Sequence, residues 1–155
     1  MYCSAVTEDT ADDGRPDLAA MTMRLGRALV AIEQPILAAH DISMWGYVVL
    51  SELRRTPIRS QSALAASIGA DKTRLIPVLD ELERRGLIER RPDADDRRVH
   101  VLRLTHAGYD AWLEVRTDIR AAEDELLRPL PARDRLSFVG TLRKLSEATA
   151  KPLRN

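Results

Sequence analysis

Apolar residues recur at helical spacing in three parts of this chain. Within residues 72–85 they occupy positions i, i+3, i+4 and i+7, and these are Leu75, Val78, Leu79 and Leu82. Similar stripes run through residues 17–39 and 132–149. Such spacing gathers the apolar side chains on one face of a helix. We therefore predict an amphipathic helix in each of these segments.

Residues that favour the starts and ends of helices predict three further helices. Ser43, Asp71 and Thr105 suit N-cap positions, because their side-chain oxygens can accept hydrogen bonds from free backbone N–H groups. Gly69 and Gly86 suit the left-handed conformation in which many helices end. The further helices that these signals predict cover residues 44–55, 61–68 and 105–128.

A β-hairpin is predicted after the helix over 72–85. Residues 87–91 and 99–104 read as antiparallel strands, separated by the turn-forming residues Pro92, Asp93, Ala94, Asp95 and Asp96. Two short helices joined by a tight glycine-containing turn form a helix-turn-helix, and the hairpin adds a wing. The expected fold class is mainly α with a small β-hairpin wing: a winged helix-turn-helix lobe plus a helical layer from the N- and C-terminal helices.

The charge pattern of the predicted lobe favours DNA binding. Lys72, Thr73 and Arg74 open the second helix of the pair, where a recognition helix meets base edges and phosphates. Arg97 and Arg98 follow the hairpin tip, from which an arginine can enter a narrow minor groove. We therefore expect double-stranded DNA as a partner. A winged helix that binds a protein, without sequence-specific DNA binding, is the alternative.

The overall composition is compatible with this interpretation. The 155 residues include 24 Lys and Arg and 24 Asp and Glu, for a formal net charge of +0. A balanced total can hide a local field. Here five acidic residues lie in the first 17 positions, while cationic residues gather in the parts of the lobe that are predicted to face DNA. One cysteine, no membrane-length apolar run and no signal-peptide pattern lead us to expect a cytoplasmic protein with no membrane partner.

The helices outside the lobe predict a dimer. We divide the chain into a flexible acidic tail (1–16), an N-terminal dimerisation helix (17–42), the DNA-binding lobe (43–105), C-terminal dimerisation helices (106–149) and a second tail (150–155). The apolar stripes of the outer helices need more cover than one small lobe provides, and a second subunit would supply it with two-fold symmetry. Two recognition helices would then lie roughly 34–36 Å apart, which predicts a palindromic operator.

No catalytic, metal or redox site is predicted. His40, His100 and His106 do not share a metal-ligand spacing. Cys3 has acidic residues nearby, which do not favour a reactive thiolate. No glycine-rich phosphate loop and no nucleophile with a matching base stand out in the sequence. We expect neither an enzyme nor a bound cofactor.

Several motifs of the lobe resemble those of the multiple-antibiotic-resistance regulator (MarR) family. Asp96-Arg97-Arg98, followed by Leu102 and by Leu104-Thr105, is similar to the Asp-x-Arg…Leu…Leu-Thr wing signature of that family. Residues 43–50, 62–69 and 71–91 are similar to its second helix, its third helix, and its recognition helix with the first wing strand. The resemblance extends over residues 18–148. It implies a homodimeric regulator, which we expect to be a repressor, whose DNA affinity a small ligand often changes.

The resemblance also implies roles for single residues. The DNA-contacting residues that we predict are Ser60, Gln61, Lys72, Thr73, Arg74, Pro77, Asp96, Arg97 and Arg98. Lys72, Thr73 and Arg74 match major-groove positions of the family, and Ser60 and Gln61 match positions near the phosphates. Asp96 would orient Arg98 through a bidentate pair. Pro77 departs from the family pattern, and its ring could either contact a thymine methyl group or face solvent.

A ligand site is implied only by the family. Its small aromatic or anionic effectors often bind between the dimer helices and the DNA-binding lobe. The residues near that junction are Arg24, Arg27, His40, Trp45 and Tyr47. Trp45 and Tyr47 also suit a core or interface position, and the sequence leaves both interpretations open.

Overall fold

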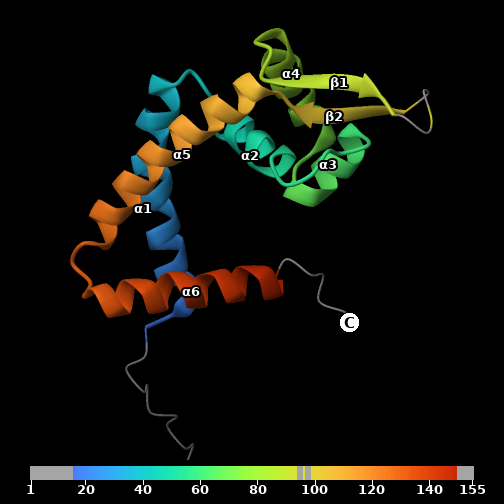
Figure 1. The fold of residues 1–155 in the computed structure, drawn as a ribbon. Coiled ribbons are helices and arrows are strands. Elements are labelled where there is room, and N and C mark those ends of the chain that lie inside the picture. The colour runs from blue at the N-terminus through green and yellow to red at the C-terminus, as the bar shows by residue number, and fades with distance from the viewer. Residues whose placement is uncertain (1–15, 94–95, 97–98, 150–155) are drawn as a thin grey trace, which may run out of the picture.

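The computed structural model describes residues 16–93, 96 and 99–149, where six helices and one hairpin follow the predicted order (Figure 1). The helices are α1 (Leu18–Ala39), α2 (Met44–Leu53), α3 (Gln61–Ile68), α4 (Lys72–Arg84), α5 (His106–Leu127) and α6 (Ala132–Thr149). The strands β1 (Ile88–Pro92) and β2 (His100–Leu104) pair antiparallel. The predicted fold class, mainly α with a small β-hairpin wing, is confirmed. Nearly all of both predicted tails, including Cys3, lies outside the described residues.

Side-chain caps explain why the predicted helix starts are confirmed. The Ser43 hydroxyl accepts a hydrogen bond from the Gly46 N–H at 3.0 Å. Gly69 ends α3 in the left-handed region, with a φ of 65°. Such signals act within a few residues of a helix end, so the sequence alone contains them. The end of α2 lies two residues before the predicted one, because the Arg55 N–H bonds the Glu52 carbonyl three residues back and the chain already turns.

The hairpin differs from the prediction at its edges. β2 begins at His100, because the Val99 N–H donates to the Asp96 carbonyl at 2.9 Å and so belongs to the turn. Ile58, in the predicted loop before α3, exchanges two backbone hydrogen bonds with Leu102 at 3.0 and 2.8 Å. This bridge, which the sequence did not predict, ties the segment before α3 to the wing.

The core lies where α2, α3, α4 and the hairpin meet the first half of α5. Its most completely buried side chains are Leu50, Leu64, Leu75, Leu79, Ile88, Leu102, Val49 and Val115. The predicted stripe of α4 faces this core, and Pro77 lies exposed on the other side. Both α1 and α4 continue through their internal prolines. The outward face of α4 is therefore presented on a helix anchored by its buried leucines.

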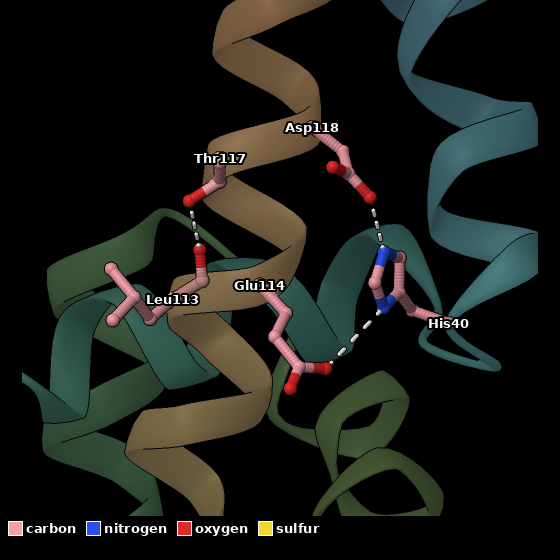
Figure 2. Close-up of polar contacts among 5 residues, drawn as sticks. All are labelled: His40, Leu113, Glu114, Thr117 and Asp118. Carbon is pink, nitrogen blue, oxygen red and sulfur yellow. Dashed lines mark hydrogen bonds and ion pairs between the residues drawn. The ribbon is translucent and has the colours of Figure 1, made fainter.

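α5 joins the winged lobe to α1. Figure 1 shows α5 leaving the lobe and running beside α1. Trp112, Val115 and Ile119 of α5 are buried. At the end of α1, the His40 Nε2 atom lies 2.7 Å from the Asp118 carboxylate of α5 (Figure 2). The lobe and the outer helices are thus linked by apolar packing and by a polar contact.

α6 is the helix with the least cover. None of its described side chains is buried, and Figure 1 shows it away from the winged lobe. Its exposed apolar residues are Leu136, Val139, Leu142 and Leu145. The predicted stripe is therefore present but faces outward, with little cover from the described part of the chain.

Candidate nucleic-acid interface

The N-terminal end of α4 presents polar and cationic side chains to solvent. Lys72, Thr73 and Arg74 are all exposed. The Asp71 carboxylate accepts hydrogen bonds from the Thr73 and Arg74 N–H groups at 2.8 and 3.3 Å. These two bonds hold the pKa of Asp71 below its ordinary value, so the carboxylate stays charged and fixes the first turn. The predicted recognition residues therefore lie together at one defined helix end.

A concave surface lies between this helix end, the start of α3 and the wing. It has a volume of about 520 Å³ and is lined by Arg59, Ser60, Gln61, Ser62, Lys72, Arg90, Val99, His100 and Leu102. The Ser60 hydroxyl caps α3 by accepting from the Ala63 N–H at 3.0 Å. The structure thus brings the predicted Ser60, Gln61 and Lys72 together on a surface that carries three cationic side chains.

The acidic half of α4 is neutralised by ion pairs. Arg90 of β1 contacts the Asp80 carboxylate at 2.9 Å and the Glu83 carboxylate at 2.9 Å. Arg84 donates two hydrogen bonds to Glu81, at 2.9 and 2.7 Å. By contrast, Lys72 and Arg74 form no ion pair within the described part of the chain. The free positive charge of α4 is therefore concentrated in its first turn.

Arg90 is a residue that the sequence analysis missed. It follows buried Ile88 by two positions on β1, and strand residues at that spacing share a face. This alternation could have predicted that Arg90 turns toward α4. The ion pairs of Arg90 with Asp80 and Glu83 could not be predicted, because they depend on how the strand packs on the helix. Its Nε atom is buried and has no hydrogen-bond partner within the described residues.

The base of the wing tip is organised by Asp93. This residue is 9% exposed; its N–H donates to the Val99 carbonyl at 2.7 Å, and its carboxylate lies 3.2 Å from the Arg59 Nε atom. The sequence assigned Asp93 only to a turn, whereas it also ties the wing to the segment before α3. Asp96 is exposed. Arg97 and Arg98 lie outside the described residues, so the predicted pair of Asp96 with Arg98 is not tested.

One of the predicted effector residues lies in a groove. Tyr47 lines a depression of about 370 Å³ together with Arg54, Trp112 and Arg116. The Cζ atoms of the two arginines lie 4.5 and 5.1 Å from the centre of the Trp112 ring. Guanidinium groups at such distances are attracted to the indole face. Trp112 and its arginines were not predicted, because their approach joins α2 to a helix about 60 positions later in the chain.

The other predicted effector residues lie elsewhere. Figure 2 shows the two ring nitrogens of His40 directed at Asp118 and Glu114, so the imidazole links α1 to α5. Trp45 is half-buried and packs against the core. Arg24 and Arg27 are exposed on α1. The five residues therefore do not form one site in a single copy of the chain.

The described ranges contain neither a metal-binding cluster nor a membrane-spanning helix. No three His, Cys, Asp or Glu side chains of residues 16–93, 96 and 99–149 are arranged to hold a metal ion. Over the same ranges, none of the helices combines the length and the apolar character of a membrane span.

Comparison with known proteins points to one family. Residues 42–100 match the model of the MarR family. Over 99 residues the chain is 29% identical to a protein of Thauera aromatica that is named as a transcriptional regulatory protein for the hcr operon. The match covers 64% of this chain and 60% of that relative, so the chain spans less than two thirds of the relative's length.

Solved structures share the fold. The chain is similar to CouR of Rhodococcus jostii RHA1 bound to p-coumaroyl-CoA, with a TM-score of 0.74 and 24% identity over 90% of this chain and 95% of that one. It is similar to the repressor CouR bound to a 23-mer DNA duplex, with a TM-score of 0.71 and 25% identity over 84% and 92%. Apo MarR of E. coli gives a TM-score of 0.73 and 21% identity over 84% and 98%.

Proposed function

We propose that the chain is a transcription regulator of the MarR family, whose model matches residues 42–100, and that it binds duplex DNA through α3, α4 and the wing. The observation that carries this proposal is the distribution of charge on α4. Its acidic residues are held by Arg84 and Arg90, while Lys72 and Arg74 remain exposed at the end that a recognition helix directs at DNA. Catalysis forms no part of the proposal.

Each part of this surface has a proposed contact. The first turns of α4 enter the major groove, where Lys72, Thr73 and Arg74 meet bases and phosphates. Ser60 and Gln61 lie beside Lys72 and meet the adjoining phosphates. From the wing, Arg97 and Arg98 reach the flanking minor groove, with Asp96 as the orienting carboxylate.

We further propose that two copies act together as a repressor. The outward apolar residues of α6 favour a second copy as cover, and a two-fold dimer would read a palindromic operator. CouR, which is 25% identical in sequence to this chain, is a repressor, and this supports repression as the proposed role here. A small aromatic or anionic effector would suit the groove of Tyr47, Trp112 and Arg116, which offers aromatic rings beside cations.

The proposal is tested by selecting a duplex from a random library and measuring its binding by fluorescence anisotropy. We expect nanomolar affinity for the selected duplex and much weaker affinity for a scrambled one. The logarithm of the association constant should fall linearly with the logarithm of salt concentration, because phosphate contacts release counterions. Weak binding of equal strength to both duplexes would instead favour the protein-binding alternative.

Replacing Arg74 with alanine is expected to weaken binding to the selected duplex about 5- to 150-fold. The exposed guanidinium has no carboxylate partner among the described residues, so the change removes a donor fork that suits guanine, which contributes about 1–3 kcal/mol. Preference at one base pair should relax as well. Arg128→Ala is the matched control, because Arg128 is an exposed arginine at the far end of α5. Equal losses for the two variants would contradict the assignment of Arg74.

A further inference from the structure

Two apolar side chains are exposed on the helix that we place in the major groove. Ile76 is 41% exposed, and Pro77 is also exposed. They follow Lys72 and Thr73 by four positions, and residues at that spacing are neighbours on a helix. Each polar residue of the first turn therefore has an apolar residue about one turn, or about 5.4 Å, further along the helix. The outward surface of α4 changes from polar to apolar within two turns.

The hydrogen-bonding groups of α4 cannot read every base. Its sequence contains no Asn or Gln, the side chains whose amides read adenine through two hydrogen bonds. A carboxylate could accept from cytosine, but Asp80 and Glu83 are held by Arg90. Glu81 is held by Arg84 in the same way. The cationic donors of α4 without an ion pair among the described residues are Lys72 and Arg74, and long cationic donors suit guanine.

α4 therefore lacks the bidentate amide contact to adenine, and a different feature can supply recognition of A·T pairs. The major-groove edge of such a pair carries the C5-methyl group of thymine, which apolar side chains contact. Ile76 lies on the side of α4 that faces the wing, since Asp80, four positions later, bonds Arg90 of β1. Pro77 follows Thr73 by one turn and is exposed at the edge of a depression that it shares with Asp41 and Ser43, between α4 and the α1–α2 connection. Both residues are thus placed to meet bases next to those that Lys72 and Arg74 contact.

From these observations we propose that Ile76 and Pro77 read A·T base pairs through the thymine methyl group. The guanine contacts of Lys72 or Arg74 lie one or two base pairs away, since one helical turn corresponds to roughly that many 3.4 Å base steps. This inference rests on the proposed DNA binding and adds its sequence preference. It assigns to Ile76 and Pro77 the base recognition that the polar side chains of α4 leave open.

Deoxyuridine provides a direct test, because it differs from thymidine only by the missing C5-methyl group. Thymidines of the duplex selected above are replaced one at a time, and affinity is measured by anisotropy. We expect one or two positions in each half-site at which the replacement weakens binding about fourfold, the effect of one buried methyl group. All other positions should respond little.

Variants then connect the methyl group to the protein. Ile76→Ala or Pro77→Ala should bind thymidine and deoxyuridine duplexes equally at one sensitive position, because the contact is already lost. Lys72→Ala should weaken both duplexes while keeping their fourfold ratio. The ratio is taken within each variant, so a change in folding stability cancels from it.

The outcomes separate this inference from the proposed function. Sequence-specific binding without any sensitive thymidine would overturn the methyl contact and leave the DNA-binding function intact. The methyl contact would also be wrong if both alanine variants retained the full deoxyuridine effect. Absence of any preferred duplex would overturn the methyl contact and the proposed function together.

Discussion

Replacing Gly108 with alanine is expected to lower the free energy of unfolding by about 3 kcal/mol. Gly108 lies in the first turn of α5, where an added Cβ atom would stand 1.9 Å from the carbonyl oxygen of Leu87 and 2.8 Å from the Leu104 Cδ1 atom. The leucine side chain could rotate away, but the Leu87 carbonyl belongs to the backbone. Either α5 or the start of β1 would have to move.

Hydrogen bonds at the same place resist that movement. The Thr105 N–H donates to the Leu87 carbonyl at 3.2 Å, and the Thr105 hydroxyl lies 2.7 Å from the Gly86 carbonyl. The hydroxyl also accepts from the Gly108 N–H at 2.9 Å. A displaced α5 would lose several of these bonds at once, and a lost hydrogen bond costs about 1 kcal/mol. The close approach is therefore built into the junction of wing and α5.

Urea denaturation followed by circular dichroism, at one fixed protein concentration, measures the effect. His106→Ala is the matched control, because its side chain lies in the same turn and is 92% exposed. That control is expected to change the free energy of unfolding by less than about 0.5 kcal/mol. If the Gly108 variant were as stable as the control, the close packing of α5 on Leu87 would be wrong.

The Gly108 contact also illustrates what the sequence could not predict. Caps such as Ser43, Asp71 and Thr105 act on backbone groups two or three residues away, so local sequence reveals them. The contact of Gly108 with Leu87 and the bridge of Ile58 with Leu102 join distant segments. Such pairings depend on how the elements pack, and apolar spacing alone does not specify a partner.

In the candidate site, too, local features could be predicted from the sequence and contacts between distant segments could not. The exposure of Lys72, Thr73 and Arg74 could be predicted, because the stripe of buried leucines fixes which face of α4 is outward. The ion pairs of Arg90 with Asp80 and Glu83 were missed. These pairs matter most for the proposed function, since they neutralise acidic charge that would otherwise repel the phosphates of DNA. The charge of a recognition helix therefore has to be counted with its partners.

The second large effect concerns the apolar face of α6. Replacing Val139 and Leu142 together with glutamate is expected to convert the proposed dimer to a monomer at micromolar concentration. These two side chains lie about 60° apart around the helix, and they are 52% and 40% exposed in one copy. In a two-fold dimer each change occurs twice, so four apolar side chains lose their cover, at about 1.5–3 kcal/mol each. The sum, about 6–12 kcal/mol, is comparable with the roughly 8.2 kcal/mol of a micromolar complex.

Sedimentation velocity of both variants gives the mass directly. Lys144→Glu is the matched control, since it also adds acidic charge to α6 but lies on the face opposite the apolar stripe. The control should remain dimeric. A double variant of Val139 and Leu142 that stayed dimeric would show that this face of α6 lies outside the interface. A wild-type protein that was monomeric at micromolar concentration would overturn the dimer itself.

The same variant tests how dimerisation contributes to DNA binding. In a dimer the second recognition helix binds its half-site as part of the same complex, which strengthens binding by about 10²–10⁴ over one half-site alone. The monomeric variant keeps every residue of the α3, α4 and wing surface, so it should weaken binding by that factor while preserving the base preference of one half-site. If the monomer instead bound the selected duplex as tightly as the wild type, one lobe would suffice. The palindromic operator would then be wrong even though the recognition surface on α4 remained correct.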